Sequence, residues 1–427
     1  MGKPTVTLAT SDFIGLARST MKGSGVGDMP FVVVPHPLGG ISKEEVRAKA
    51  EAAFPGILKA ATQWEATAKL PPPMLPYPAE RFKFKGTVED VNTLFFEKGW
   101  SLGLPLIPPT PERVASMLKG TSHKPDEILW KVPPRKGALT VELLATLGVM
   151  AGCKPEFMPL LIAIVEAMKE TVFDWAGQTT TTNPTYPLII VNGPIVRELG
   201  IASGQGAAAG GYHPNVSIGY FVNLLGDIVG GSKAPEPDKS TLGQPGNIVA
   251  TVIGENVSAL PKGWKPLSEE RGLGQDTSAV TLVSIEGSRN MNIAQPDKAS
   301  WILDIIAVEM QTLGPNNTVL YRGKGETDVV LLLCPQHADV MGKEGWSKER
   351  VQGYLFEKAR IPYDRWMLNV RTVYSKDPWY TKFKSGDPVP VVDSPKNILV
   401  GVSGGAGTHS VYFSGFGRPA ITKEIKK

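Results

Sequence analysis

The sequence Pro-Leu-Ile-Ile-Val-Asn-Gly-Pro at residues 187–194 decides the fold we expect, together with the glycine-rich passage and apolar helix pattern that follow it. Leu188 to Val191 form a short apolar run, which is typical of a strand buried on both faces, and Asn-Gly-Pro ends it. Five apolar residues then recur at helical spacing: Ile218, Phe221, Val222, Leu225 and Val229. Residues 187–231 are therefore predicted to fold as a strand, a glycine-rich loop and a helix.

The loop of this unit is a candidate binding site. Glycines between 204 and 211 let a backbone approach a ligand closely, and a helix that begins near Pro214 offers free N–H groups to an anion. Tight packing of a helix on a sheet explains the same glycines equally well. The residues taken as substrate-binding candidates here are Gly210, Tyr212, His213 and Asn215. The spacing Gly-x-Gly-x-x-x-Gly, far from the strand end, argues against a nicotinamide cofactor.

Composition limits the classes of protein that the chain can belong to. It has 427 residues, of which 42% are hydrophobic and 20% charged, enough for two or three soluble domains. A net charge of +4 without a basic, aromatic-rich run argues against nucleic-acid binding. No apolar run approaches the roughly 20 residues of a membrane span, and the N-terminus lacks an apolar signal core. We therefore expect a cytoplasmic protein that contacts neither nucleic acid nor membrane.

The N-terminal residues predict a small α/β unit. Strands are expected at residues 5–9 and 31–34, and helices at 11–21 and from Ser42, where Glu45 completes a capping box. His36 directly follows the second strand, at the end where open α/β sheets bind ligands. Prolines at 71–78 then predict a stiff linker. The expected boundaries are a module at 1–66, a linker at 67–86 and a larger α/β region at 87–427, mainly helical at 87–185 and α/β at 186–427.

Further apolar runs at residues 248–253, 279–285, 329–333 and 397–402 also lead into polar or glycine-rich loops. We read them as one mixed or parallel sheet whose carboxyl edge forms a single pocket. An alternative for the charged members is a solvated ion-pair network. The candidates after these strands are Glu255, Asn256, Arg271, Asp276, Ser403, Gly404, Gly405 and His409.

Two cysteines and five scattered histidines leave metal and thiol chemistry open. Cys153 and Cys334 form neither a zinc spacing nor a disulfide framework. Cys153 precedes a helix that starts at Pro155, and both that helix N-terminus and Lys154 would favour a reactive thiolate. A small buried hydrophobe is the competing interpretation. A metal ion is one candidate cofactor, but only the fold could assemble its ligands.

Two stretches carry a family resemblance: Thr5-Val-Thr-Leu-Ala-Thr to Ala17, and Val34-Pro-His-Pro-Leu-Gly-Gly40 with residues 42–50. They resemble the second half of the UGSC family, small proteins named for a motif of selenocysteine or cysteine followed by Gly-Ser-Cys. Later segments, including Met150-Ala-Gly-Cys153, Gly243-Gln-Pro-Gly246 and Glu270-Arg-Gly272, look like a long, poorly characterised family associated with it. The resemblance implies a half-Rossmann-like N-terminal module that lacks the half with the reactive motif.

That absence leads to the functional expectation. Half a domain exposes a sheet edge and an apolar face, so a partner subunit bearing the Cys/Sec-Gly-Ser-Cys half is expected to complete it. The chain would then be the substrate-binding or catalytic subunit of a hetero-oligomeric oxidoreductase or lyase acting on a small anionic substrate. Arg271 would anchor the anion, Glu255 or His36 would transfer protons, and Cys153 is a further catalytic candidate. The alternatives are a non-catalytic scaffold subunit and a metal-assisted hydrolase or lyase that uses His36, His213, His337 or His409.

Overall fold

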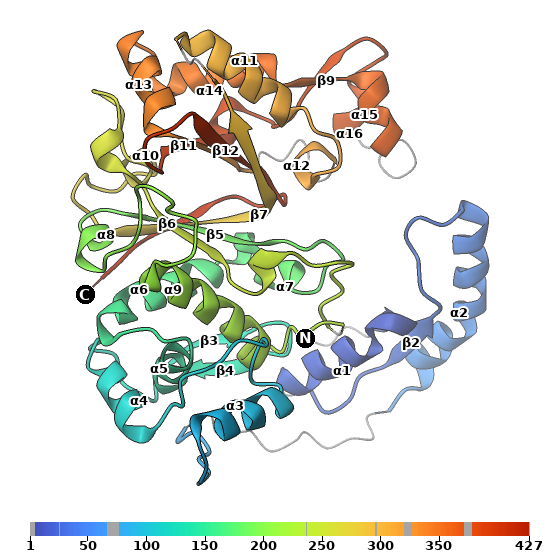
Figure 1. Ribbon diagram of the computed structural model, residues 1–427. Coiled ribbons are helices and arrows are strands. Elements are labelled where there is room, and N and C mark those ends of the chain that lie inside the picture. Colours follow the sequence, from blue (N-terminus) through green and yellow to red (C-terminus); the bar gives the residue numbers. More distant parts are fainter. Residues whose placement is uncertain are drawn as a thin grey trace.

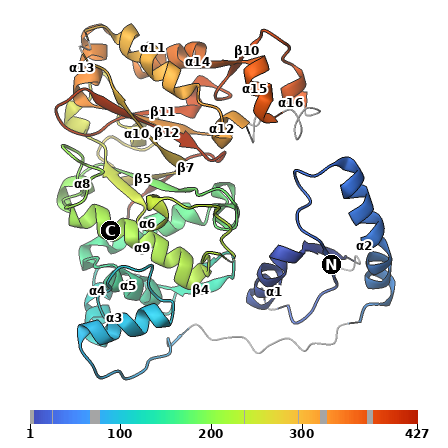
Figure 2. The same cartoon turned by 45° about the vertical axis from the view of Figure 1, so that its right-hand side comes forward.

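The computed structural model describes residues 5–24, 26–65, 77–235, 237–294, 297–319, 327–370 and 378–426. Residues 67–76 of the expected linker at 67–86 lie outside these residues. Figures 1 and 2 show the N-terminal module beside the larger α/β region, with strands and helices in both. The expected α/β class is confirmed. No helix among the described residues combines the length and apolar character needed to cross a membrane.

The N-terminal module forms as the sequence predicts. Strands β1 (Thr7–Thr10) and β2 (Phe31–Val34) pair in parallel, in register from Thr7 with Phe31 to Thr10 with Val34. Helix α1 (Ile14–Gly23) follows a short 3-10 turn, and α2 (Lys43–Gln63) begins at the predicted capping box of Ser42 and Glu45. Few interactions join this module to the rest of the chain; Thr20 Oγ1 donates to the Pro134 carbonyl at 3.3 Å.

Residues 87–185 form a helical layer with one hairpin. The helices are α3 (Val88–Glu97), α4 (Pro111–Leu118), α5 (Val141–Met150), α6 (Met158–Met168) and α7 (Trp175–Gln178), and the hairpin strands are β3 (Ile128–Val132) and β4 (Gly137–Thr140). The prolines at 133–134 lie in the turn between these two antiparallel strands, where a missing N–H donor costs nothing.

The main sheet has seven strands in the order β11-β8-β12-β7-β5-β6, and β13 also pairs with β7. The strands are β5 (Tyr186–Asn192), β6 (Thr251–Gly254), β7 (Ala279–Asn292), β8 (Val329–Leu333), β11 (Ile398–Val402), β12 (His409–Gly415) and β13 (Ile421–Glu424). Pairs β5–β6 and β8–β11 are parallel, whereas β7, β12 and β13 make antiparallel pairs. Of the two expected sheet types, the mixed one is observed.

The sheet consists of two halves with the same topology. In the first, β5 and β6 are parallel neighbours joined through α9 (His213–Leu224), and β7 pairs antiparallel with β5. In the second, β8 and β11 are joined through α13 (Pro335–Lys343) and α14 (Lys348–Lys358), and β12 pairs antiparallel with β8. The long strand β7 belongs to both halves, because its first part pairs with β5 and its second with β12.

Shorter elements complete the larger region. They are α8 (Ile195–Glu198), a π-helix (Leu225–Gly230) that continues α9, α10 (Leu267–Glu270), α11 (Ala299–Met310), α12 (Asn316–Val319), β9 (Arg360–Pro362), α15 (Tyr363–Val370), α16 (Pro378–Thr381) and β10 (Pro388–Pro390).

Three buried clusters show how the halves stack. Alternate residues of β5, such as Ile189 and Val191, pack on the helices of the first half, while Leu188 and Ile190 face a second cluster. That second cluster also contains residues from the second half of the sheet, such as Val330 and Leu332 of β8 and Leu399 of β11. The remaining face of β8 and β11 packs on α11, α13 and α14. The larger region therefore has four layers: helices, the first half of the sheet, the second half of the sheet, and further helices, as Figure 1 shows.

Candidate functional site

The carboxyl ends of β6 and β11 meet, although these two strands lie at opposite ends of the strand order. The Asn256 backbone N–H donates to the Val402 carbonyl at 2.7 Å, and its side chain donates to the Gly404 carbonyl at 3.2 Å. Ser403 Oγ donates to the carbonyls of Gly254 at 3.2 Å and Ser203 at 3.3 Å. Loops that follow β5, β6 and β11 are thus brought together, although they lie up to 200 residues apart in the sequence.

The two glycine-rich loops pack directly on each other. A Cβ on Gly405 would lie 2.2 Å from Gln205 Oε1 and 2.9 Å from its Cα, so only glycine fits there. Tyr212 donates through its hydroxyl to the Gln205 carbonyl at 2.6 Å, and Gly210 is exposed nearby in the sequence. Asn215 is buried and ties the loop to the sheet, because its side chain donates to the Val252 carbonyl at 2.8 Å. Its polar atoms hold the loop in place.

Glu255 lies in a buried polar network behind this edge. Its Oε2 accepts from the backbone N–H of Leu267 at 2.7 Å and from the side chain of Asn192. Its Oε1 lies 3.8 Å from the ammonium of Lys348, which also donates to Glu270 at 3.1 Å. The Glu255 and Lys348 side chains are only 1% and 2% exposed. The Glu255 carboxylate is therefore part of a buried ion pair and is almost completely shielded from solvent.

Burial dominates the electrostatics of this network. It raises the pKa of Glu270, and the nearby Lys348 ammonium partly offsets that shift. The buried carboxylate of Glu255 depends on the buried Lys348 ammonium, because a buried charge without a partner is strongly destabilising, whereas the Glu270 side chain is 21% exposed. The network joins the loop after β6 to the start of α14, and so joins the two halves of the sheet.

The Arg271 guanidinium forms its contacts with other residues of the same chain. Its guanidinium donates to the Ala420 carbonyl and to Thr422 Oγ1, the latter at 3.3 Å, and lies 4.0 Å from Asp328. These contacts tie the end of α10 to β13. The expected anion anchor is thus a link within the fold, and its carboxylate partner is Asp328, which the ion-pair alternative had not included. Asp276 is exposed in the turn before β7.

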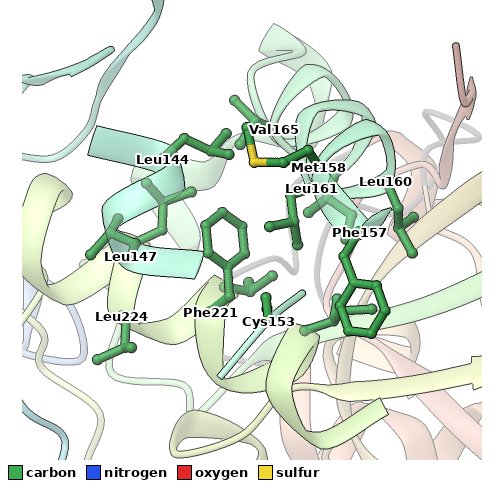
Figure 3. Close-up of a cluster of buried hydrophobic side chains, with 14 of the residues drawn as sticks. Leu144, Leu147, Cys153, Phe157, Met158, Leu160, Leu161, Val165, Phe221 and Leu224 are labelled. Atoms are coloured by element: carbon green, nitrogen blue, oxygen red, sulfur yellow. The ribbon is translucent and has the colours of Figure 1, made fainter. Parts of the chain in front are cut away.

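Cys153 belongs to the apolar core between α5, α6 and α9, as Figure 3 shows. Burial raises the pKa of the Cys153 thiol to about 12, and a hydrogen bond with Ser217 opposes this only in part. The expectation of a reactive thiolate is therefore wrong for this structure, because the loss of hydration outweighs any effect of the nearby helix end. His213 lies next to this core and contacts the Gly152 carbonyl through Nε2 at 2.8 Å.

His36 lies at the carboxyl end of the N-terminal sheet, where the sequence predicts it. Its ring Nδ1 is 3.1 Å from Thr10 Oγ1, and its backbone N–H donates to Ser11 Oγ at 3.1 Å. The Phe13 ring stands 5.8 Å away from the imidazole. Lys49 holds the same loop by donating to the carbonyls of Pro35 and Pro37 at 3.1 and 2.7 Å. The imidazole is exposed and is oriented by residues of both strand ends.

The other histidines lie elsewhere. His337 is fully buried and contacts Ser410 Oγ through Nδ1 at 2.6 Å, and burial lowers its pKa. His409 is exposed beside Asn290 at 2.9 Å. In the part of the chain that the structure describes, no three His, Cys, Asp or Glu side chains gather as a metal site would require. His36 and His213 thus lie in separate surroundings, whereas His409 lies near enough to His337 to lower the pKa of His337 further.

Sequence reasoning missed Lys348, Asn192 and Asp227. Lys348 looks like an ordinary first-turn lysine of a capped helix, and nothing in the sequence shows that the fold buries it. Asp227 did leave a signal, since a carboxylate interrupts the apolar helical pattern that ends at Val229. It lies in the π-helix and lines two cavities.

Comparison with known proteins gives one finding. Residues 1–63 match the UGSC family, which confirms the resemblance seen in the first sixty residues. No family is assigned to the rest of the chain. Neither the curated proteins nor the solved structures yielded a match.

Proposed function

We propose that the chain is one subunit of a heteromeric enzyme that acts on a small molecule, and that a second polypeptide completes its N-terminal module. The partner would carry the Cys-Gly-Ser-Cys or selenocysteine-Gly-Ser-Cys motif that the UGSC resemblance implies. The observation that carries this proposal is the unfinished state of the module: among the described residues its paired strands have no further neighbour, and its core is very small.

The size of the core supports this reading. Among the described residues, the buried hydrophobic members of the module's cluster are Val32, Val34 and Ala53, and Ala9 is also buried. Two paired strands are marginally stable in water unless further strands or helices cover them. Within the described residues, β1 and β2 pair only with each other, so each leaves one edge free for a further strand.

The apolar side chains outside this core point to the same conclusion. On the strands, Leu8 is 53% and Val33 is 49% exposed. On α2, Phe54 is 62% and Leu58 is 54% exposed, and their i, i+4 spacing puts them on one side of the helix. Apolar residues gathered on so small a module are typical of a protein interface.

His36 gives the proposed interface a chemical role. It lies at the carboxyl ends of both strands, where the completed sheet would bind a ligand. A thiol that the partner brings within hydrogen-bonding distance of the free ring nitrogen can transfer its proton to the imidazole, leaving a thiolate as the nucleophile. Thr10 fixes the ring by contacting Nδ1. In this arrangement the larger region would supply substrate contacts.

Assembly is tested by co-expressing the chain with a candidate partner that carries the motif and measuring the mass of the complex in solution. Val33→Asp should abolish the complex, because it places a charge in the proposed interface. Ile128→Asp is the matched control: Ile128 is 48% exposed on strand β3, outside the module, and its change should leave the complex intact. Equal effects of both variants, or a chain that remains monomeric with every such partner, would contradict the proposal.

The scaffold alternative predicts a different result for His36. In the enzyme, His36→Gln should leave assembly intact and raise the pKa of the partner's thiol, read from its alkylation rate against pH. If His36 is only structural, the alkylation profile of the complex will not move.

A further inference from the structure

A cationic cavity lies beside the π-helix, and Asp227 is part of its lining. It has a volume of about 330 Å³, which falls at the lower end of the range typical of small-molecule sites. Its walls come from three elements: the end of α3 with Lys98 and Trp100, the β3–β4 hairpin with Arg135, and the chain from Asp227 to Lys233. Short π-helical segments are frequent at functional sites.

Glycines allow these elements to approach closely. A Cβ on Gly137 would lie 2.1 Å from the Val229 carbonyl oxygen, so the hairpin can pack on the π-helix only with glycine there. A Cβ on Gly99 would lie 2.5 Å from Lys233 Nζ, and one on Gly231 would lie 2.5 Å from Arg135 Cδ. Both cationic side chains therefore pass directly over a glycine, and any larger residue would displace them.

The charges in this cavity are unbalanced. Lys98, Arg135 and Lys233 line it, and none of them forms an ion pair or a side-chain hydrogen bond within the described ranges of the chain. Asp227 is the one carboxylate in the lining. Burial raises the pKa of Asp227 to about 7, while a hydrogen bond from Ser232 and the charge of Lys233 act in the opposite direction. The cavity thus carries a net positive charge near neutral pH.

An aromatic side chain completes the site, and a second cavity with free polar atoms adjoins it. The Trp100 ring lines the cavity and contacts Phe82 and Phe95, each with its ring centre 5.9 Å away. Across Asp227 lies a second cavity of about 50 Å³, room for only a few water-sized groups. Its lining includes Trp175 Nε1 and Gln178 Oε1, which are buried and have no hydrogen-bond partner. Buried polar atoms left free in this way are uncommon and typical of ligand sites.

We propose that the cavity lined by Lys98, Arg135 and Lys233 binds a small organic anion through its carboxylate or phosphate group. The guanidinium of Arg135 offers two parallel donors to such a group, and the two ammonium groups supply further charge. The flat face of Trp100 covers the apolar part of the ligand. The site belongs to the larger region alone, so it is independent of any partner of the N-terminal module.

The test measures binding to the purified full chain by calorimetry, with inorganic phosphate in one arm and succinate in the other, each against sodium chloride at equal ionic strength. Saturable binding in either arm is expected, and the arm that binds identifies the anionic group. Arg135→Ala and Lys233→Ala should each weaken it by about ten- to a hundredfold, as loss of a charged hydrogen bond does.

Lys131→Ala is the matched control, because Lys131 is an exposed cation on the same hairpin but does not line the cavity. It should bind as the unchanged chain does. Asp227→Asn should strengthen binding, since it removes the only negative charge of the lining. The proposal is overturned if neither anion binds at millimolar concentration, or if Lys131→Ala weakens binding as much as Arg135→Ala.

Discussion

Replacing Lys348 with methionine should destabilise the larger region strongly. The Lys348 ammonium lies 3.1 Å from Glu270 and 3.8 Å from Glu255, and its side chain is 2% exposed. Methionine preserves most of the volume but removes the charge, together with the hydrogen bond to the Lys265 carbonyl at 2.6 Å. Glu255, which is 1% exposed, then has no cation to balance it. Breaking a buried ion pair from one side costs about 3–5 kcal/mol, and we expect a loss of that size in the free energy of unfolding.

A surface lysine provides the comparison. Lys265 pairs with Glu269 at 3.0 Å, but its side chain is 62% exposed. Water screens this pair, so Lys265→Met should cost less than about 1 kcal/mol. The double variant Lys348→Met with Glu255→Gln should recover part of the loss, because a neutral amide needs no balancing cation.

The measurement is unfolding in urea, followed by circular dichroism, with the shift in midpoint converted through the slope. The reasoning is refuted if Lys348→Met costs no more than Lys265→Met. It is equally refuted if adding Glu255→Gln deepens the loss, because Glu255 would then not be the group left without a partner.

Three further predictions concern single buried groups. Cys153 should resist alkylation in the folded chain at pH 8 and react after unfolding, because burial raises the pKa of its thiol to about 12; fast labelling of the native protein would contradict its buried position. Burial likewise raises the pKa of Glu286 from 4.5 to about 7, so stability should fall as the pH rises between these values. Glu286→Gln should remove this fall in the free energy of unfolding, which amounts to up to about 3 kcal/mol. A variant with the same pH dependence of stability as the unchanged chain would contradict the prediction. Gly405→Ala should expose the glycine-rich loops to protease through its clash with Gln205, whereas Gly353→Ala, a helical position with open space, should not.

The sequence predicted the elements whose signal is local. The apolar run at 329–333 and the capping box at Ser42 both form as expected, because burial on both faces and cap chemistry are decided within a few residues. The convergence of the loops after β6 and β11 does not follow from such a local rule, because the two strands lie at opposite ends of the order β11-β8-β12-β7-β5-β6 and meet through the curl of the sheet.

What the sequence could not show depends on distant pairing. Glu255 pairs with Lys348, and Arg271 donates to the Ala420 carbonyl. These partners lie 93 and 149 residues further along the chain. The antiparallel strands β12 and β13 follow glycine-rich and proline-containing passages, and their pairing with β7 gives no periodic signal by itself. Cys153 shows a competition of two effects, in which burial outweighs the nearby helix end. The protonation and pairing of these side chains depend on how deeply the fold buries them.

The central claim, that the N-terminal module is completed by a second polypeptide, is tested most directly by hydrogen exchange of its strand amides. In the chain alone, the amides of residues 7–10 and 31–34 should exchange fast, because the two strands have open edges and a small core. Addition of a partner with the Cys/Sec-Gly-Ser-Cys motif should slow them, while those of β5, a fully buried strand, stay protected throughout. Protection of β1 and β2 equal to that of β5 in the chain alone, unchanged by any such partner, would contradict the account.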